Sequence, residues 1–453
     1  MEKIDFIVIG GGPAGYSCAK FLSLSGKKTV LVEKDEIGGI CLNRGCIPTK
    51  TILSSLKRFS GFLKGIKGGE FVAKGDVALS TENIIKRKEN VVRILKNGLL
   101  SELQKAGVKI IKGFAKFEDE KVLDVDGKKF SADGIVIAVG SSPLLPPPLK
   151  KTDRIIFAEE SFDIMKNPPS NICIIGGGAI GCEMAQIFSA LGSRVTVVEI
   201  MEHILPFLDK EIADTLRREM EKTGIKILSN RRVESFEENG SSVKLRLSGG
   251  EEIAAELVLI AAGRTANTEN LNLRGIETQR GWIRVNENFE TSVSGIYAIG
   301  DCNGISLTAY GGYIQAVVLS NLINGEKRTY PGEFIPGGIF TNPEVAWAGL
   351  TSKEALKRGY EIGERSSLVR EIGRAHAEGE IGGIAKITFE KRTKRVLGVQ
   401  IVSPHATEII NYLGTLILKG VTVEDIAFTH HLHPTFSEVI WEASLKGIFD
   451  RNV

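Results

Sequence analysis

Short continuous runs of apolar residues recur along the chain, and two of them lead straight into glycine-rich turns. Residues 6–9 and 172–175 are such runs. Apolar runs of this length, without polar alternation, are typical of parallel strands that are buried on both faces. A helical pattern follows each turn, and a second apolar run follows each helix, at residues 29–33 and 195–199. The pattern therefore predicts two strand–turn–helix–strand units of the same kind.

Each turn carries the glycine spacing GxGxxG, and a glutamate, Glu33 or Glu199, stands 23 residues after its first glycine. The glycines are Gly10, Gly12 and Gly15 in the first turn and Gly176, Gly178 and Gly181 in the second. The spacing alone is a weak signal, but strand, glycines, helix, strand and terminal acid together make a dinucleotide-binding fingerprint. The glycines let the backbone approach a pyrophosphate at the helix N-terminus, and the carboxylate suits ribose hydroxyls. Two copies predict two bound dinucleotides, whereas one copy alone would resemble an ordinary βαβ turn.

The remaining pattern divides the chain further. A helix predicted over about residues 84–105 carries apolar side chains that we interpret as packing: Val91, Ile94, Leu95, Leu99 and Leu103. Short strands lead to an apolar run at residues 135–139, and the prolines at positions 143–148 predict a rigid linker and a domain boundary near residue 150. From about Phe334 the pattern changes to alternating strands and two helices.

Composition narrows the class of protein. A chain of 453 residues is too long for one core and suggests two to four domains. The net charge of +3, from 58 basic and 55 acidic residues, gives no case for nucleic acid or an anionic membrane as a partner. We expect no membrane span, no metal site and, because the first strand begins so early, no signal peptide. Six cysteines are too few for a disulfide scaffold, so a cytoplasmic location is expected.

Two of those cysteines, Cys41 and Cys46, stand five residues apart with Gly45 between them. Five residues of continuous helix rise roughly 7.5 Å, whereas disulfide-bonded Cα atoms lie about 5.5–6 Å apart. The thiols can therefore bond only if a helix bends or begins between them, which Gly45 allows. Such a disulfide would be strained and easily reduced. On spacing alone, two unrelated packing thiols are an equally good interpretation.

The residues around the cysteines favour the redox interpretation. Residues 38–50 read GGICLNRGCIPTK and match the pattern GGxCxxxGCxP[ST]K at every fixed position. With the doubled fingerprint, this stretch resembles the two-cysteine, FAD/NAD-linked pyridine nucleotide-disulfide oxidoreductase family, and within it the dihydrolipoamide dehydrogenases most. The resemblance covers nearly the whole chain. It implies an α/β fold with two Rossmann-like dinucleotide-binding domains and a C-terminal α+β dimerisation domain.

The resemblance also implies a domain order. Residues 1–150 would form the first part of the FAD-binding domain, with the redox disulfide. Residues 151–265 would bind NAD, residues 266–333 would return to the FAD-binding domain, and residues 334–453 would form the dimerisation (interface) domain.

By resemblance, the first fingerprint holds FAD and the second holds the nicotinamide cofactor. The further FAD-binding residues would be Lys50, Ala115, Gly140, Asp301 and Ala309, and the further NAD-binding residues Ile180, Val233 and Gly263. A carboxylate at Glu199, followed by Ile200, Met201 and Glu202, suits a free 2′-hydroxyl and repels a 2′-phosphate. The expected cofactor is therefore NAD rather than NADP.

The resemblance assigns catalytic roles as well. Cys41 and Cys46 would form the redox disulfide, with Cys41 exchanging with the substrate sulfur and Cys46 lying against the flavin. Lys50 would sit near the flavin N5, paired with Glu183. His433 and Glu438, in the stretch HLHPTFSE, match the family's acid–base pair; the role of His431 is open.

The implied assembly is a homodimer with shared active sites, in which His433 serves the disulfide of the partner chain. The substrate would be a lipoyl-carrying protein or a small disulfide. The larger partner would be a 2-oxo acid dehydrogenase complex or a glycine cleavage complex.

One stretch departs from the family pattern. Dihydrolipoamide dehydrogenases usually have Leu-Ala-His and then Glu-Gly on the helix after the second FAD motif. This chain has Thr308-Ala309-Tyr310 and then Gln315-Ala316. The change lies near the flavin pyrimidine in the family, so it bears on the substrate and on the flavin potential.

Four alternatives stay open. An NADH-dependent reductase of another small disulfide would use the same residues. Glutathione reductase is disfavoured because its NADP-binding arginines are absent after Val198, and mercuric reductase because no cysteine follows Cys302 up to the end at residues 450–453. A non-catalytic NAD-sensing or scaffold subunit would not need the intact cysteines, Lys50 or His433.

Overall fold

The computed structural model describes residues 4–449. These residues divide into two compact units, and each unit is assembled from separate stretches of chain. The first unit contains residues 4–52, 82–144 and 263–332, and the second contains residues 53–81, 145–262 and 333–449. The chain therefore leaves the first unit and returns to it more than once, and residues distant in sequence build each unit together.

The first unit is built on a five-stranded parallel sheet in the order β20-β7-β1-β2-β3. The strands are β1 (Phe6–Ile9), β2 (Thr29–Glu33), β3 (Lys109–Lys112), β7 (Gly134–Ile137) and β20 (Ile296–Ala298). Because successive side chains of a strand point to opposite faces, Val8, Leu31 and Val136 pack on one face and Ile7, Val30 and Ile135 on the other.

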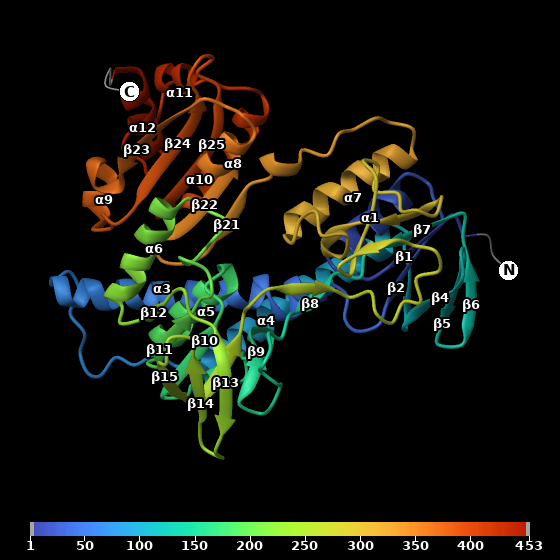
Figure 1. Cartoon of the computed structure of the whole chain (residues 1–453), viewed down its shortest axis with the longest axis horizontal. Coiled ribbons are helices and arrows are strands. Elements are labelled where there is room, and N and C mark those ends of the chain that lie inside the picture. The colour runs from blue at the N-terminus through green and yellow to red at the C-terminus, as the bar shows by residue number, and fades with distance from the viewer. Residues whose placement is uncertain (1–3, 450–453) are drawn as a thin grey trace. The chain divides into compact units, whose positions relative to one another are not determined.

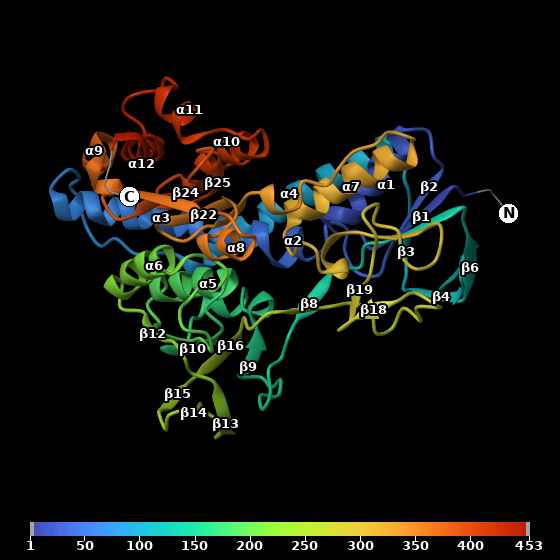
Figure 2. The same ribbon diagram turned by 45° about the horizontal axis from the view of Figure 1, so that its top comes forward.

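Helices and a small sheet cover the two faces. Helices α1 (Pro13–Leu24) and α7 (Ala309–Ile323) run side by side over the first face (Figure 2). The three-stranded sheet β4 (Ala115–Asp119), β5 (Val122–Val125) and β6 (Lys128–Ser131) packs on the second. The other elements that lie in or enter this unit are α2 (Gly39–Arg44), α3 (Cys46–Gly68), α4 (Thr81–Lys105), β8 (Ser141–Pro143), β17 (Arg264–Ala266), β18 (Thr278–Gln279) and β19 (Trp282–Ile283).

The second unit contains a second parallel sheet, in the order β12-β11-β10-β16-β9. Its strands are β9 (Ile155–Phe157), β10 (Asn171–Ile175), β11 (Arg194–Val198), β12 (Lys226–Leu228) and β16 (Leu257–Ile260). The connecting helices are α5 (Ala179–Ala190) and α6 (Lys210–Lys222). A meander of β13 (Val233–Glu238), β14 (Val243–Leu247) and β15 (Glu252–Ala255) packs on it. In both parallel sheets, chain order reverses beside the first strand, β1 or β10, and ligands bind at such a switch point.

The C-terminal part of the second unit is an antiparallel sheet in the order β21-β22-β25-β24-β23 (Figure 1). The strands are β21 (Gly337–Ile339), β22 (Glu344–Gly349), β23 (Ile362–Leu368), β24 (Ile384–Glu390) and β25 (Val396–Ser403). The helices are α8 (Ser352–Lys357), α9 (Gly373–Glu378), α10 (Ala406–Leu418), α11 (Val423–Phe428) and α12 (Glu438–Phe449). The core lies between one sheet face and α10, α11 and α12. Short 3-10 helices complete the chain at Ala158–Glu160, Ile164–Lys166, Gly300–Asn303, Gly332–Phe334 and Val369–Glu371.

These sheets confirm the predicted fold class of two dinucleotide-binding α/β lobes and a C-terminal α+β part. One local expectation was wrong. Ile94 and Leu95 are 57% and 44% exposed within the chain, so they are not packing residues of the kind predicted for α4. Residues 141–143 pair as β8 with β17, so the first proline of the predicted linker lies in a strand. Among the described residues, no helix is both long and apolar enough to cross a membrane.

Candidate functional site

The first glycine turn lies at the carboxyl end of β1 and leads into α1. Gly10 has a φ of +102°, and a Cβ there would lie 2.4 Å from the Ala138 carbonyl oxygen. A Cβ on Gly15 would lie 1.8 Å from the Gly10 oxygen. Only glycine fits these two positions, because the turn is tight and α1 packs closely on the strand.

The second glycine turn repeats this geometry between β10 and α5. Gly176 has a φ of +107°, and a Cβ there would lie 2.4 Å from the Ala261 oxygen. A Cβ on Gly181 would lie 1.9 Å from the Gly176 oxygen. The predicted duplication is therefore present in backbone geometry as well as in sequence.

The middle glycines are different, because the space around them is open. A Cβ on Gly12 would come no closer than 4.0 Å to the nearest atom, Gly39 Cα, and no described atom lies within 4 Å of a Cβ on Gly178. Both are N-cap residues, of α1 and α5, so no cap side chain satisfies the first-turn N–H groups. An open cradle at a helix N-terminus fits a pyrophosphate, which needs close backbone approach and gains from the helix dipole.

The two acidic residues close the turns in the same way. Glu33 Oε2 accepts the Gly11 N–H at 2.6 Å and Oε1 accepts the Asp35 N–H at 2.7 Å. Glu199 Oε2 accepts the Gly177 N–H at 2.6 Å and Oε1 accepts the Met201 N–H at 2.8 Å. A carboxylate has about four acceptor positions, so each can bind its own turn and still accept hydrogen bonds from a ribose.

The cysteine pair lies where one helix ends and the next begins. Helix α2 ends at Arg44 and α3 begins at Cys46, with Gly45 between them at φ −135° and ψ −105°. The helix break that a Cys41–Cys46 disulfide would need is therefore present at Gly45. A Cβ on Gly45 would lie 3.0 Å from the Ile40 oxygen, so the break also leaves little room for a side chain.

Both cysteines are thiols in the structure, and Cys41 is hydrogen-bonded to the Cys46 side chain. That hydrogen bond, burial and the charge of Cys46 raise the pKa of the Cys41 thiol well above its ordinary value, although Lys50 acts in the opposite direction. The pKa of the packing thiols Cys18, Cys173 and Cys302 is also raised, to about 12, but there burial is the main cause.

Lys50 and Glu183 lie in different units. Lys50 is partly buried on the first turns of α3, and Glu183 is buried on α5. Glu183 Oε1 accepts the Phe340 N–H at 2.9 Å. The predicted pairing of Lys50 with Glu183 stays a prediction.

Other predicted FAD residues lie in the same unit as the first glycine turn. Ala115 is buried at the start of β4, and Gly140 has a φ of +70° after β7. Asp301 follows β20, and its Oδ2 accepts the Ser141 hydroxyl at 2.5 Å. Burial raises the pKa of the Asp301 carboxyl, although Ser141 and Arg264 oppose it.

Sequence reasoning missed Ser141 and Arg264. Arg264 donates to the Ser141 Oγ and carbonyl oxygen at 2.6 Å each, and its Nε is 3.9 Å from Asp301 Oδ2. The two residues directly follow Gly140 and Gly263 in β8 and β17. Their position after the last apolar strand of each lobe was a usable signal, because carboxyl ends of parallel strands carry ligand-binding residues.

The departure from the family pattern falls on α7. Ala309 is its first residue, after the N-cap Thr308, and Tyr310 is 58% exposed. Gln315 is fully buried, and its Oε1 accepts the Gly300 N–H at 2.7 Å and the Asn303 Nδ2 at 2.8 Å. Gln315 therefore holds the turn that carries Asp301.

The predicted NAD residues do not all lie in the same unit. Ile180 is 39% exposed on the first turn of α5, beside the second glycine turn, and Val233 is buried at the start of β13. Arg231, two residues before Val233, forms an ion pair with Glu251 at 2.7 Å. Gly263, at φ +115°, lies in the first unit rather than with the other NAD residues.

His433 and Glu438 are brought together. The Glu438 Oε1 accepts the His433 Nδ1–H at 2.7 Å. The His433 side chain is 77% exposed while that of Glu438 is only 10% exposed, so the buried carboxylate orients an imidazole whose other side faces outward. His431 instead bonds the Ile426 carbonyl through Nε2 at 3.2 Å, which supports a packing role.

Comparison with known proteins agrees with this geometry. Residues 4–318 match the family "Pyridine nucleotide-disulphide oxidoreductase", and residues 335–444 match its dimerisation domain. A dihydrolipoyl dehydrogenase from Thermus scotoductus is 36% identical, with 98% of this chain and 97% of the relative covered. One from Chlorobaculum tepidum is 34% identical over the same shares.

Solved structures are similar over the whole chain. The flavoprotein disulfide reductase RclA from Escherichia coli has a TM-score of 0.87 and 26% identity, covering 97% of this chain and 99% of that one. LpdA from Mycobacterium tuberculosis has a TM-score of 0.88 and 25% identity, covering 98% and 100%.

The family match covers well over half of the chain, and the relatives cover nearly all of it. The cofactors are FAD and NAD. The chain belongs to the pyridine nucleotide-disulphide oxidoreductase family, as a flavin-dependent dithiol/disulfide oxidoreductase with the family's dimerisation domain.

Proposed function

We propose that the protein is a dihydrolipoamide dehydrogenase, which oxidises protein-bound dihydrolipoamide with NAD⁺ as the acceptor. The observation that carries the proposal is the cysteine pair at the α2–α3 break, in which the Cys41 side chain is hydrogen-bonded to that of Cys46. The names of the relatives support the lipoyl substrate.

The two cysteines would carry the exchange with the substrate. In the oxidised state, Cys41 and Cys46 form a disulfide, and one substrate thiolate attacks the Cys41 sulfur and releases Cys46 as a thiolate. The second substrate thiol then displaces Cys41, which leaves oxidised lipoamide and a reduced cysteine pair. Bound FAD supplies a two-electron carrier from this pair to the nicotinamide.

His433 would take the proton from the substrate dithiol through Nε2. The hydrogen bond from Nδ1 to Glu438 fixes the tautomer that leaves Nε2 as the acceptor. A carboxylate that orients a histidine in this way also stabilises the imidazolium that forms. This is the acid–base arrangement that dithiol exchange needs.

The nucleotide residues would bind as predicted. Gly10, Gly12, Gly15, Glu33, Ala115, Gly140, Asp301 and Ala309 would hold FAD, with Lys50 near the flavin and Glu183 as its partner. Gly176, Gly178, Ile180, Gly181, Glu199, Val233 and Gly263 would hold NAD. The open N-cap positions at Gly12 and Gly178 support both pyrophosphate assignments.

We further propose a homodimer in which His433 serves the dithiol of the partner chain. The matched dimerisation domain and the outward-facing imidazole support this. The larger assembly would be a 2-oxo acid dehydrogenase or glycine cleavage complex. The cytoplasmic location stays a prediction.

A second candidate is an NADH-dependent reductase of another small disulfide. Two observations support this candidate: the similarity to RclA, a flavoprotein disulfide reductase, and the departures from the family pattern at Tyr310 and Gln315. The test is a panel on the FAD-loaded protein: dihydrolipoamide with NAD⁺, and glutathione disulfide, coenzyme A disulfide and free quinones with NADH. Fastest turnover with dihydrolipoamide is expected. Faster turnover with another acceptor would overturn the lipoyl assignment, and a flavin that NADH does not bleach would favour the non-catalytic subunit.

A further inference from the structure

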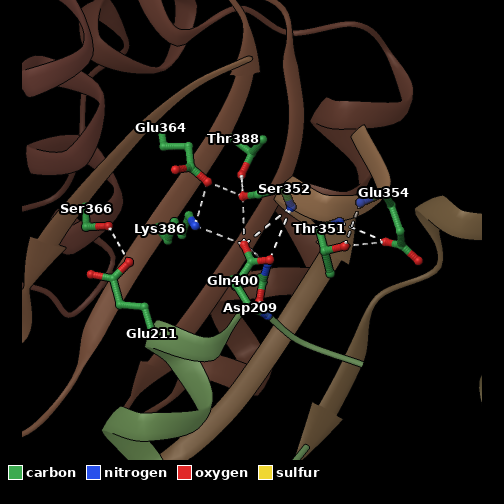
Figure 3. Close-up of polar contacts among 10 residues, drawn as sticks. All are labelled: Asp209, Glu211, Thr351, Ser352, Glu354, Glu364, Ser366, Lys386, Thr388 and Gln400. Atoms are coloured by element: carbon green, nitrogen blue, oxygen red, sulfur yellow. Dashed lines mark hydrogen bonds and ion pairs between the residues drawn. The ribbon is translucent and has the colours of Figure 1, made fainter. Parts of the chain in front are cut away.

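A buried ionic cluster joins the NAD lobe, residues 145–262, to the C-terminal sheet of the same unit (Figure 3). Lys386, on β24, donates to Asp209 Oδ2 at 3.0 Å and to Glu364 Oε1 at 2.7 Å. The Lys386 side chain is 9% exposed and that of Asp209 is 10% exposed. A buried charge pair is costly to assemble and is retained only when its geometry is well satisfied, so this cluster needs an explanation.

Asp209 is the N-cap residue of α6, but its carboxylate does not cap that helix. Asp is a preferred N-cap residue because its side chain usually accepts the free N–H groups of the first turn. Here the carboxylate points to the sheet and accepts Gln400 Nε2 at 2.8 Å and the Ser352 hydroxyl at 2.9 Å. The Asp209 N–H in turn donates to Gln400 Oε1 at 2.9 Å. The segment before α6 is therefore fixed to the sheet by both its backbone and its side chain.

The face of the C-terminal sheet that contacts Asp209 carries polar side chains from three neighbouring strands. Lys386 and Gln400 are paired across β24 and β25, and Glu364 and Thr388 across β23 and β24, so their side chains share one face. Burial alone would lower the pKa of Lys386, but the hydrogen bonds and charges of Glu364 and Asp209 outweigh it and raise that pKa. Lys386 is therefore a stable cation in this position.

The other end of the same segment lies at the NAD cradle. The segment, residues 200–209, directly follows Glu199, and the Met201 N–H donates to the Glu199 carboxylate at 2.8 Å. The Leu205 N–H donates to the carbonyl oxygen of Gly177, inside the glycine turn, at 2.9 Å. Phe207 packs on Trp347 of β22, with ring centroids 5.1 Å apart. One short segment thus connects the nucleotide turn to the buried cluster.

We propose that Lys386 and Asp209 are positioning residues for NAD. They hold segment 200–209 against the sheet, and the segment holds Glu199 and the second glycine turn in the geometry that binds the adenosine half of the cofactor. This inference rests on the proposed assignment of Glu199 to NAD.

The test compares Lys386→Met with Lys244→Met in the FAD-loaded protein. Lys244 pairs with Glu252 across two strands of the NAD lobe, but its side chain is 48% exposed. We expect Lys386→Met to raise the Kd for ADP-ribose and the KM for NAD⁺ about tenfold, with FAD content, the KM for dihydrolipoamide and kcat unchanged. ADP-ribose, measured by calorimetry, reports binding without any redox step. Lys244→Met should change none of these quantities.

Two further variants keep the test decisive. If Lys386→Met does not fold, Glu364→Gln removes the more exposed anion and should raise the Kd for ADP-ribose in the same direction, by less. The double variant Asp209→Asn with Lys386→Met removes the buried Asp209 charge and leaves only the partly exposed Glu364 carboxylate without its lysine, so it should bind ADP-ribose more tightly than Lys386→Met alone.

The outcomes distinguish the positioning role from the NAD assignment. Equal losses in every kinetic parameter together with a lower Tm, or an unchanged Kd for ADP-ribose, would show that the cluster only stabilises the fold and would overturn the proposal. Glu199→Gln serves as the reference. If it too leaves the Kd for ADP-ribose unchanged, the NAD assignment itself is wrong; if it weakens binding and Lys386→Met does not, only the positioning role fails.

Discussion

The two α/β lobes, which we propose as the FAD lobe and the NAD lobe, share the same glycine turn and differ in the segment after their second strand. The Gly11–Glu33 and Gly177–Glu199 hydrogen bonds are both 2.6 Å long. After Glu33 the chain continues into α2 and the cysteine pair, whereas after Glu199 it continues to Asp209 and the buried cluster. The two strands, the glycine turn and the terminal glutamate therefore form the same dinucleotide-binding unit in both lobes. The segment after the acid carries the specialisation, which is redox chemistry in one lobe and attachment to the C-terminal sheet in the other.

The largest expected effect comes from changing the cysteine pair, which the NAD lobe lacks. Cys46→Ser should lower dithiol oxidation on the order of a thousandfold or more, because the covalent route is lost. Cys41→Ser should leave Cys46 as a thiolate beside oxidised flavin, which gives a long-wavelength charge-transfer absorption band.

Cys173→Ala is the matched control for both variants, since Cys173 is a buried thiol of the NAD lobe. It should keep activity and show no such band. If Cys41→Ser shows no band at any pH up to the titration of the thiol, the role assigned to Cys46 is wrong.

The glycine turn of each lobe can be tested separately by a substitution at its middle glycine, Gly12 or Gly178, where the space around an added Cβ is open. Gly178→Ala meets no described atom within 4 Å, so the fold should tolerate it, but its methyl group would occupy the pyrophosphate space. We expect the KM for NAD⁺ to rise at least about tenfold, which is about 1.4 kcal/mol of binding free energy, with FAD content and Tm unchanged. Gly12→Ala should instead lower FAD content.

The control is Gly98→Ala on α4, where the added methyl group also meets no described atom within 4 Å and favours the helix. It should leave both cofactors bound. Loss of FAD rather than NAD in Gly178→Ala would mean that the two lobes have been assigned to the wrong cofactors.

A third experiment concerns the acid–base pair, which neither lobe supplies. Chains carrying Cys41→Ser and chains carrying His433→Ala should each form nearly inactive homodimers. After mixed refolding, about half of the dimers are mixed, and a shared site makes one of their two sites intact. Roughly a quarter of all sites should then regain activity, as expected for a two-fold dimer. Recovery near zero, with mixed dimers demonstrated by differential tagging, would place the site within one chain.

Much of the difference between the lobes could be predicted from the sequence, and the reasons are physical. The runs at β1 and β2 matched the structure residue for residue, because both faces of these strands are buried and no alternation blurs the signal. Gly45 pointed to the helix break because a disulfide between Cys41 and Cys46 would need one there. The pairing of His433 with Glu438 agreed with their short separation along the chain.

Other features could not be predicted because they depend on packing between distant segments. Lys386 lies in a strand that is buried on both faces, so no polar alternation distinguishes a buried lysine from an exposed one. Asp209 looks like an ordinary N-cap residue, and only the fold shows that its carboxylate points to the sheet. Ile94 and Leu95 have helical spacing, yet their helix face is exposed within the chain.

The smallest expected effect is at the departure on α7. Tyr310→His removes a ring that is 58% exposed and lies 6.5 Å from that of Tyr313, so activity should change by less than about threefold. Gln315→Glu is more informative, because Gln315 is fully buried and its Oε1 already accepts two hydrogen bonds. A protonated carboxylic acid in this position can make the same two hydrogen bonds as the amide. Its carbonyl oxygen can accept the Gly300 N–H and the Asn303 Nδ2, and its hydroxyl then takes the place of the amide nitrogen.

Burial without a cation partner raises the pKa of such a carboxyl group. At low pH the Gln315→Glu variant should therefore have the flavin potential of the wild type. As the pH rises through the raised pKa, the new negative charge beside the Asp301 turn should disfavour the reduced flavin and lower its potential. The measurement is a redox titration of both proteins between about pH 5 and pH 9, with the exposed substitution Gln279→Glu on β18 as the control. A potential that tracks the wild type over the whole range would show that Gln315 only holds the turn. A potential that is shifted equally at every pH would show that the carboxylate is charged throughout and that burial does not control it.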